Sequence, residues 1–455
     1  MTTLEGDLMS GSAKPQDNAN AREHGQPEPT YCDPSTPFLM NAARQHPETS
    51  LCFLGGFFDK DREAQIRAQS RGPVQDAANA LQWLIIDGLG ANWDGPLKLV
   101  TAPFIGSFPK RYTRPLLRSW SFQRGPGLGG VSIGFMNLPI LKHFSRRRRV
   151  ARELAKWARV TPGNKVVVAY SLNFSFMGAL RALKTKHPEA RVCVVVPDLP
   201  EFMNTSATST LAYRLLKRLE ISSMWRNFAA VDSLVLLTEA MRERLPDGPA
   251  HIVIEGVGVP IEAVATPKER APERTVLYAG TLHERYGILL LLDAFELIDD
   301  CDLRLLICGD GDAAKAVREA CARDARLRYL GILPREEVLD LERRATVLIN
   351  PRTADEEFTR YSFPSKILEY MGAGRPVIAY ELPGAPAEYR DYLIYVERGG
   401  AVALAESIVS VCRMDEEALD ELGRRGQDFV KNHKSPQVQG AKILSHALSA
   451  KRAMT

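Results

Sequence analysis

Short apolar runs rich in β-branched residues recur along the chain from about residue 50, and longer segments with helical periodicity separate them. The first series of apolar runs is 51–57, 97–102, 165–170, 191–197, 233–238 and 251–256. The helical patterns among them are 74–89, 146–159, 174–186, 208–228 and 239–245. Strands that are almost continuously apolar are typical of a parallel sheet covered by helices on both faces. The pattern predicts a doubly wound α/β domain.

The alternation stops at 258–273, where Pro and charged residues follow no clear period, and then restarts. The second series of apolar runs is 275–280, 303–309, 327–331, 346–350 and 376–380. Helical patterns stand at 287–298, 312–322, 335–343 and 362–373. We therefore expect an α/β protein of two doubly wound Rossmann-like domains, which face each other across a cleft where the strands end.

This organisation implies five parts along the chain. They are a disordered tail at 1–36, a first Rossmann-like domain at 37–260, a linker at 261–273, a second Rossmann-like domain at 274–430, and a final helix at 431–455 that packs back on the first domain. The tail has no basic start and no apolar core, so a signal peptide is not expected. No run reaches about 18 apolar residues, so no spanning helix is predicted either.

Composition narrows the class of protein. The chain is 45% hydrophobic and 25% charged, which is ordinary for a soluble globular protein, and its net charge of +4 alone does not indicate a nucleic-acid binder. The seven cysteines are odd in number and none has CxxC spacing. Neither a disulfide framework nor a zinc site is predicted, and a reducing cytosol fits.

The segment 361–379, YSFPSKILEYMGAGRPVIA, carries the clearest candidate chemistry. A strand and a polar loop lead into a helix that begins at Ser362–Ser365, with Pro364 in its first turn, and ends at glycines. Free N–H groups at a helix start suit an anion such as a diphosphate. Lys366 adds a positive charge, and Glu369, one turn further, can accept both hydroxyls of a ribose.

This segment resembles the signature of glycosyltransferase family 4, retaining enzymes of the GT-B fold, in the variant with F-P-S-K followed by E-Y. The resemblance covers most of 275–395. It implies that Glu369 holds the ribose of a nucleotide-sugar and that the helix start carries the diphosphate. The family has two glutamates eight positions apart, and Tyr361 stands where the earlier one is expected; Glu356 and Glu357 are candidates to compensate.

Further pieces agree with the resemblance. In the loop after the strand 275–280, Thr281 replaces the family's usual arginine, so Arg285 is the remaining candidate to grip the diphosphate. Gly309 and Asp310 lie in a glycine-rich turn, where turn formation and helix capping are the alternative roles. The full set of expected donor-binding residues is Glu369, Tyr361, Ser362, Phe363, Ser365, Gly280, Thr281, Gly309, Asp310, Ile332 and Leu333, the last two against the base.

The first domain is expected to bind the acceptor. The family often has a histidine after a strand of this domain, and Pro197 stands there, followed by Asp198. Asp198 is a candidate to orient the acceptor hydroxyl or act as a base, with loop capping as the alternative. The other expected acceptor residues, all at predicted strand ends, are Gly55, Gly56, Tyr170 and Ser171.

The mechanism that the family implies is front-face transfer, in which the departing diphosphate accepts the acceptor proton. The protein then positions two substrates and stabilises charge on the diphosphate. The candidate catalytic residues are Arg285, Lys366 and Asp198. Because cationic side chains and the helix start can carry the negative charge, neither a metal nor a cofactor is expected.

Residues 101–160 contain thirteen Lys or Arg and a single acid, Glu153. The part 104–124 interleaves aromatic residues with cations, and 145–160 is a helical pattern with Val150, Leu154 and Trp157 on one stripe. Basic amphipathic helices lie on anionic membranes, so contact with such a surface through both segments is predicted. The alternative is that the stripe faces the core. Nucleic-acid binding is not expected, because no recognition module accompanies the charge.

Together these observations predict a cytoplasmic, retaining glycosyltransferase, peripheral on the inner face of the cell membrane. Its substrates would be a nucleotide-sugar and a lipid-linked saccharide acceptor in polysaccharide biosynthesis. Two alternatives stay open. One is a nucleotide-sugar epimerase of the same fold, and the other is an inactive nucleotide-sugar-binding subunit, in view of Tyr361, Thr281 and Pro197.

Overall fold

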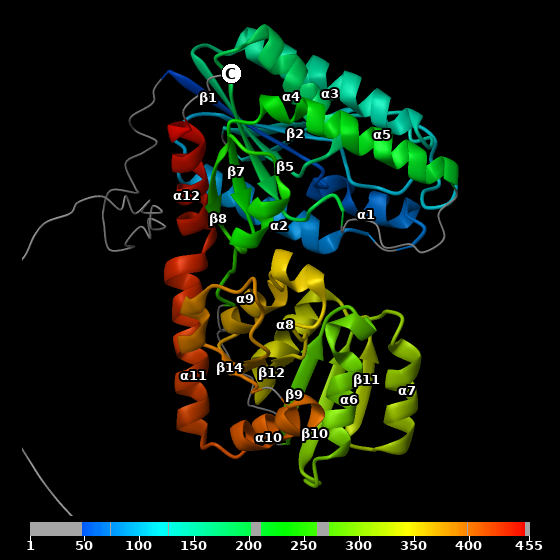
Figure 1. Ribbon diagram of the computed structural model, residues 1–455, viewed down its shortest axis with the longest axis vertical. Helices are drawn as coiled ribbons and strands as arrows, with labels where there is room; N and C mark the ends of the chain where they lie inside the picture. Colours follow the sequence, from blue (N-terminus) through cyan, green and yellow to red (C-terminus); the bar gives the residue numbers. More distant parts are fainter. Residues whose placement is uncertain are drawn as a thin grey trace, which may run out of the picture. The chain divides into compact units, whose positions relative to one another are not determined.

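The computed structural model describes residues 48–72, 74–125, 127–201, 211–261, 273–397 and 399–450, which build two sheets and the helices around them (Figure 1). The predicted tail at 1–36 and nearly all of the predicted linker at 261–273 lie outside the described residues. None of the described helices is both long and apolar enough to cross a bilayer.

The first sheet has eight strands in the order β3-β4-β2-β1-β5-β6-β7-β8. All neighbours are parallel except β3 and β4, which pair antiparallel. The strands are β1 (Thr49–Gly55), β2 (Leu97–Thr101), β3 (Trp120–Gly125), β4 (Leu128–Ser132), β5 (Asn164–Tyr170), β6 (Arg191–Val196), β7 (Ser233–Leu236) and β8 (Ala250–Val253).

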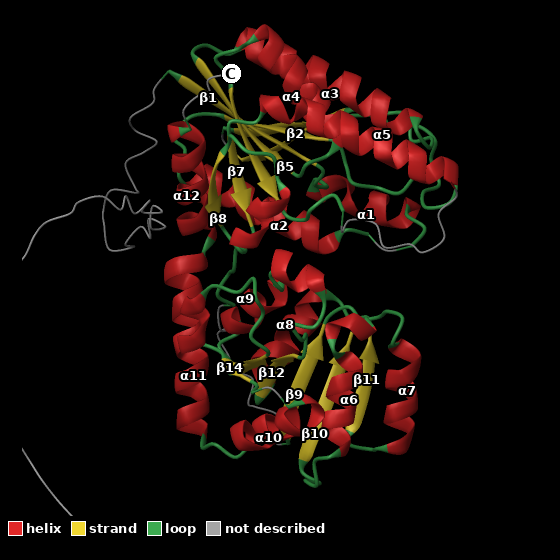
Figure 2. Ribbon diagram, in the orientation of Figure 1, coloured by secondary structure: helices red, strands yellow, loops and turns green. Residues whose placement is uncertain are grey.

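Helices cover both faces of this sheet (Figure 2). They are α1 (Lys60–Gln69), α2 (Asp76–Ala91), α3 (Leu141–Val160), α4 (Phe174–Lys186) and α5 (Leu211–Asn227), with 3-10 turns η3 (Phe228–Ala230) and η4 (Glu239–Arg244). Alternate residues of a strand face opposite sides. Accordingly, Cys52 and Leu54 pack with α3 and α4, whereas Leu51 and Phe53 pack with α2. Two cores therefore enclose one sheet.

The second sheet is fully parallel, in the order β11-β10-β9-β12-β13-β14. Its strands are β9 (Arg274–Ala279), β10 (Leu303–Cys308), β11 (Leu327–Gly331), β12 (Val347–Asn350), β13 (Val377–Ala379) and β14 (Ile394–Tyr395). Its helices are α6 (Ile288–Glu296), α7 (Ala314–Arg323), α8 (Arg335–Arg344), α9 (Ser365–Gly372) and α10 (Gly400–Cys412), with 3-10 turns η5 (Glu284–Tyr286), η6 (Glu357–Tyr361) and η7 (Ala387–Asp391).

The chain ends with α11 (Glu416–Phe429), a short π-helical turn (Val430–Lys434) and α12 (Pro436–Ser449). Helix α12 packs on α2 of the first sheet, and the two backbones meet at a glycine on each helix. A Cβ on Gly440 would lie 2.2 Å from the backbone of Gly88. Nearby, Asn92 Nδ2 donates to the carbonyl of Gln437 at 2.8 Å. Leu444 is buried in the same core as Leu51.

Two mostly parallel sheets covered by helices confirm the predicted fold class. The pattern missed α1, β14 and the β3–β4 ribbon, and the helix expected at 239–245 is a 3-10 turn. Strand β4, LGGVS, is weak by composition, and β3, WSFQRG, is largely exposed. These two strands at one end of the sheet lack the continuous apolar run by which the central strands are identified.

Candidate functional site

The strands of the second sheet are parallel, so their carboxyl ends meet at one edge, where ligands of open α/β sheets bind. Two predicted glycines come together there. Gly309, with a φ of +130°, follows β10, and a Cβ on it would lie 1.8 Å from the carbonyl oxygen of Gly280, which follows β9. Only glycine allows this approach. Beside them, Tyr278 donates its hydroxyl to the carbonyl of Thr281 at 2.8 Å.

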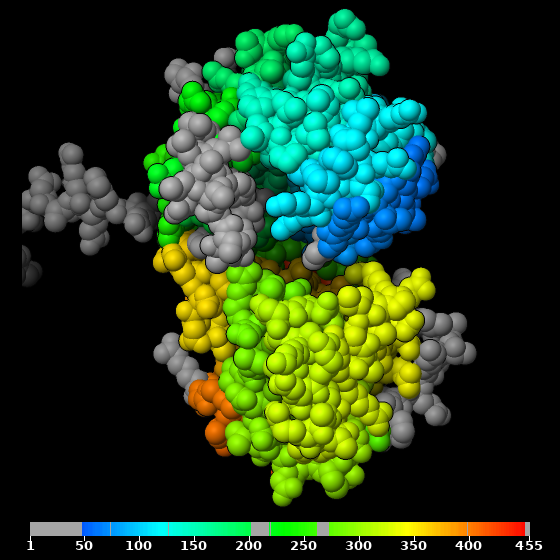
Figure 3. Space-filling model, turned by 90° about the vertical axis from the view of Figure 1, so that its right-hand side faces the viewer, coloured from blue at the N-terminus to red at the C-terminus, as the bar shows by residue number. Residues whose placement is uncertain are grey.

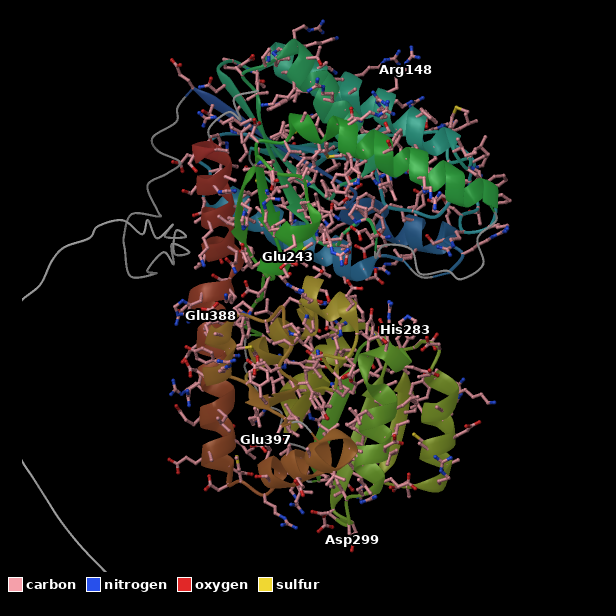
Figure 4. All side chains as sticks on the ribbon, in the orientation of Figure 1. Arg148, Glu243, His283, Asp299, Glu388 and Glu397 are labelled. Atoms are coloured by element: carbon pink, nitrogen blue, oxygen red, sulfur yellow. The ribbon has the colours of Figure 1, made fainter. Side chains whose placement is uncertain are left out.

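The loop after β9 is tied to the loop after β10. His283 Nδ1 and Asp312 Oδ2 lie 2.6 Å apart, and the N–H of Glu284 donates to the same carboxylate at 3.2 Å. His283 lies at this edge of the sheet (Figure 4). The N–H of Leu282 also donates to the carbonyl of the exposed Asp310 at 3.0 Å. Asp310 does not cap α7, because the residue that precedes this helix is Ala313.

Helix α9 begins at Ser365, and no side chain caps its first N–H groups. Its position is set by Tyr370, which is fully buried. The Tyr370 hydroxyl donates to the carbonyl of Ala279 at 3.1 Å and accepts from the N–H of the same residue at 2.8 Å. This double contact joins α9 to the end of β9.

Lys366 and Glu369 form the centre of the site, with a partner that the sequence did not suggest. Lys366 Nζ donates to Glu369 Oε1 at 2.5 Å and to Glu342 Oε1 at 3.1 Å. Glu342 belongs to α8 and is fully buried. Arg335, at the start of the same helix, lies 3.2 Å from Glu369 Oε2. The sequence feature that could have indicated a buried Glu342 is its position one turn after Val338, on the face of α8 that packs inward.

The three central groups differ in protonation. Burial, opposed by Lys366 and assisted by Glu369, raises the pKa of Glu342 to about 8. Burial would also raise the pKa of Glu369, but Lys366 and Arg335 outweigh it and hold that pKa below its usual value. Burial would lower the pKa of Lys366, but Glu369 and Glu342 keep it raised. The raised pKa of Glu342 favours its neutral form, so Lys366 and Arg335 face the single carboxylate of Glu369, an arrangement that suits an anion.

A second basic group lies on an aromatic pair. The Arg285 guanidinium is 5.2 Å from the ring of Tyr286 and 5.1 Å from that of Phe358. Arg352 lies over the same two rings, at 4.3 and 5.3 Å, and burial lowers its pKa. Sequence reasoning missed Arg352, although it stands two residues after the end of a predicted strand. Arg285 thus contacts aromatic rings and Lys366 contacts acids, so the two predicted catalytic cations belong to different groups.

Tyr361, which stands in place of the family's glutamate, is buried in the apolar core of the first sheet. Its hydroxyl accepts from Arg244 Nε at 3.1 Å, and Arg244 also lies 2.5 Å from Glu357. Arg360 and Glu243 form a second ion pair at 2.6 Å; Glu243 of η4 is labelled in Figure 4. These contacts join η6 to η4. Tyr361 and Glu357 therefore both have Arg244, a residue of the η4 turn that follows β7, as their partner.

The remaining predicted donor residues differ in exposure. Ser362 Oγ donates to the carbonyl of Phe358 at 3.1 Å. Phe363 is buried, with its ring centroid 5.0 Å from that of Tyr389. Ile332 is 77% exposed directly after β11, and Leu333 is half-buried. An exposed aliphatic side chain at a strand end remains available for a ligand, whereas Phe363 supports the packing beneath the site.

At the first sheet, protein side chains fill the space beside the predicted glycines. A Cβ on Gly56 would lie 2.2 Å from the ring of Phe104, and one on Gly55 would lie 2.3 Å from Gln82 Oε1. The N–H of Gly56 also donates to this amide oxygen at 2.7 Å. Both glycines are therefore required by packing within the protein.

Tyr170, Ser171 and Asp198 are neighbours at the ends of β5 and β6. Ser171 has a φ of +84°, a conformation that costs a non-glycine residue about 1–3 kcal/mol and that clusters at functional sites. Its hydroxyl is buried without a hydrogen-bond partner among the described residues. Asp198 is exposed as a residue, yet desolvation of its carboxyl by the neighbouring protein raises the pKa of this group to about 6. Burial, and then the charge of Asp198, raise the pKa of Tyr170.

Two buried cations of α3, missed by sequence reasoning, hold the loop after β2. Lys142 Nζ donates to the carbonyl of Ile105 at 2.6 Å, and Arg146 donates to that of Ala102. The Arg146 guanidinium is packed by three aromatic rings at 5.0 to 5.6 Å, those of Phe104, Phe135 and Phe176. Burial lowers the pKa of Lys142, with help from Arg146, to about 7, and that of Arg146 to about 10.

The apolar stripe of α3 does not face a membrane. Val150 and Leu154 are fully buried and Trp157 is nearly so, in the core that α3 shares with α4. The proposed use of this stripe on a bilayer was therefore wrong, and the alternative, that it faces the core, is confirmed. The cations on the outer face remain exposed, and Arg148 points away from the sheet (Figure 4).

The region of the second sheet is similar in sequence to known proteins. Residues 273–414 match the family model described as Glycosyl transferases group 1. Phosphatidyl-myo-inositol mannosyltransferase of Mycobacterium tuberculosis is 33% identical over 151 residues, which are 31% of this chain. The chain spans only 39% of the length of this relative.

Solved structures match both sheets. The α,α-trehalose-phosphate synthase (UDP-forming) of Burkholderia xenovorans has a TM-score of 0.59 at 12% identity, covering 87% of this chain and 99% of its own. Sucrose-phosphate synthase of Thermosynechococcus elongatus has a TM-score of 0.59 at 15% identity, covering 88% and 100%. The two-sheet architecture is therefore the GT-B fold.

Proposed function

We propose that the protein is a glycosyltransferase that moves a sugar from a nucleotide-sugar to an acceptor. The observation that carries the proposal is the Lys366–Glu369 pair at the start of α9, inside the matched domain, where two cations face one carboxylate. In this proposal the α9 start and Lys366 bind the diphosphate and Glu369 binds the ribose. Gly280 and Gly309 allow the backbone to approach the ligand.

The proposed chemistry is retaining transfer of the family 4 type. The acceptor oxygen bonds to the anomeric carbon on the face from which the diphosphate departs, the bond from that carbon to the phosphate oxygen breaks, and this oxygen takes the acceptor proton. Lys366 and Arg285 stabilise the charge that builds on the diphosphate. Asp198 orients the acceptor hydroxyl. The scheme requires neither a metal nor a cofactor.

The proposed acceptor is a saccharide linked to a lipid, in the synthesis of a polysaccharide at the cytoplasmic face of a membrane. The name of the mycobacterial relative, which includes phosphatidyl-myo-inositol, supports an acceptor with a lipid anchor and a phosphate. The excess of cations in 101–160 supports contact with anionic lipid through 104–124 and 145–160.

A second candidate is an inactive nucleotide-sugar-binding subunit. It is favoured by the engagement of Tyr361 with Arg244, which leaves the family's first glutamate without an obvious replacement. An epimerase would act on the nucleotide-sugar alone. Incubation with a membrane extract separates the three, because the transferase releases nucleoside diphosphate only with acceptor, the epimerase alters the sugar without acceptor, and the subunit does neither.

Donor binding is tested first by thermal stabilisation with a panel of UDP-, GDP- and ADP-sugars. A ligand at about 100 times its Kd adds about 2.7 kcal/mol of stability, which is readily measured. Glu369→Ala should remove this gain without unfolding the protein. Glu336→Ala, an exposed acid in the first turn of α8, is the matched control and should keep it. An unchanged response of Glu369→Ala would refute the ribose assignment.

A further inference from the structure

An apolar patch lies on the surface of the first domain at the amino end of α3. Eleven large hydrophobic side chains are exposed in the described part of the chain, and five of them belong to this patch. They are between 42% and 55% exposed, and they are Leu116, Met136, Ile140, Leu141 and Phe144. Such a concentration differs from the isolated exposed aliphatic residues that any protein surface carries.

Backbone and ring contacts make the patch continuous. Leu116 and Met136 pair in an isolated antiparallel bridge. The backbone of Met136 bonds with the hydroxyl of Ser145, at 3.2 and 3.3 Å, which brings it against the first turns of α3. Phe144 lies one turn after Leu141 on the same helical face, and its ring meets that of Phe174 edge-on at 5.8 Å. The five side chains thus occupy one surface.

The backbone of one patch residue, Ile140, is conformationally strained. Ile140, directly before α3, has a φ of +66° and a ψ of −58°, the strained conformation of a classic γ-turn, in which the N–H of Leu141 donates to the carbonyl of Pro139 at 2.7 Å. The strained residue is half-exposed, so the fold gains little burial in return. Strain of this kind marks segments that serve a function.

Cations surround the apolar patch. Arg114 and Arg118 are exposed two residues before and after Leu116, and Arg148 is exposed one turn after Phe144. They belong to the stretch 101–160, with its thirteen basic residues and one acid. In Figure 3 this stretch, cyan to turquoise on the bar, forms a broad part of the visible surface.

We propose that this patch docks on an anionic lipid bilayer, with Leu141 and Phe144 entering the boundary between headgroups and acyl chains and the arginines contacting lipid phosphates. The apolar side chains suit the acyl boundary of such a bilayer, and the cations around them suit its anionic headgroups. A second copy of the chain is disfavoured as the occupant, since a symmetric contact would bring like charges together. The proposal deepens the proposed function, because it places the protein at the membrane that holds the acceptor.

The test measures co-sedimentation with vesicles of phosphatidylcholine and phosphatidylglycerol, against vesicles of phosphatidylcholine alone. Wild-type protein should bind only the anionic vesicles. The double variant Leu141→Ser, Phe144→Ser should weaken binding by about tenfold or more. Val160→Ser is the matched control, since Val160 is 66% exposed at the other end of the same helix, and it should bind like wild type.

The charges are tested separately on the same vesicles. Arg148→Gln should weaken binding about fivefold. Lys315→Gln, at a cation of α7 whose side chain is 83% exposed, is the control and should change nothing. Each variant must keep the wild-type melting temperature and the wild-type stabilisation by nucleotide-sugar, so that unfolding does not explain a loss.

Three outcomes overturn the proposal. They are absence of wild-type binding to anionic vesicles, wild-type binding by the double variant, and a wild-type dimer that the double variant converts to monomers, which would identify a second copy as the occupant. Stabilisation by nucleotide-sugars is measured without lipid, so the donor assignment survives any of these results. Loss of that stabilisation in wild type would refute the proposed function while leaving vesicle binding to be judged by itself.

Discussion

Two lysines of this molecule lie near strand ends, Lys366 half-buried and Lys142 buried, and their environments are opposite. Lys366 of the second domain is held by two glutamate side chains, and its pKa is raised against the effect of burial. Lys142 of the first domain is held by a backbone carbonyl with Arg146 close by, and its pKa falls to about 7. The first lysine keeps its charge and the second is close to losing it.

The difference separates a binding cation from a structural one. The Glu369 carboxylate keeps Lys366 charged, and because the raised pKa of Glu342 favours its neutral form, Lys366 and Arg335 together suit an incoming anion. Carbonyl dipoles satisfy the hydrogen bonds of Lys142 without supplying a counter-charge, so this residue fixes the shape of the loop after β2. Burial alone therefore does not identify a functional cation; the groups that face it do.

The largest expected effect falls on the binding cation. Lys366→Ala should lower transferase activity by roughly 10²–10³, because a preorganised charge on the leaving diphosphate is lost. Its melting temperature should change little, and Lys315→Ala on the exposed face of α7 should keep full activity. The assay is release of nucleoside diphosphate with a membrane extract. Activity near that of wild type in Lys366→Ala would contradict the contrast drawn here.

On the structural side, Arg146→Ala should destabilise the fold by about 3 kcal/mol, because it leaves a cavity among three aromatic rings and an unpaired carbonyl at Ala102. Chemical denaturation measures this loss. Stabilisation by a nucleotide-sugar should persist in the folded fraction. If the variant lost donor binding but kept the wild-type free energy of unfolding, Arg146 would instead belong to the donor site.

The protonation of Lys142 gives a pH-dependent effect that is smaller per pH unit. Its pKa in the fold is about 7 and its ordinary value is 10.5, so between these values the unfolded chain binds a proton that the folded chain lacks. Raising the pH through this window therefore stabilises the fold, by at most about 1.4 kcal/mol per pH unit. Lys142→Met should remove this slope from denaturation curves. A slope unchanged in the variant would show that Lys142 is charged when folded.

The smallest effect concerns Glu342. Its pKa of about 8 makes it neutral at lower pH, and as the pH rises through 8 its new charge faces Glu369 and partly cancels that of Lys366. Wild-type donor affinity should fall a few-fold across this range, about 1 kcal/mol. Glu342→Gln, which stays neutral, should keep its affinity on the alkaline side. Parallel titrations of both proteins decide this, and coincident pH profiles would exclude a role for Glu342 ionisation.

Much of the donor-binding side is predictable from sequence because the features that mark it involve residues close together in the chain. Strand ends, glycine turns and the segment carrying Lys366 and Glu369 each depend on neighbouring residues. Glu342 reaches Lys366 only through the packing of α8 on α9, which no local pattern encodes. The stripe containing Trp157 shows another limit, since the same periodicity suits a core and a bilayer, and only burial separates them.

Helix α12, the last described element, completes the core of the first sheet through its contact with α2 at Gly88 and Gly440. The first domain is thus built from segments that lie far apart in the sequence. During synthesis it can bury Leu51 and its neighbours fully only after residues near 448 have left the ribosome. A cut between the two sheets would therefore not release two independent folding units, and removing α12 would damage the domain that is made first.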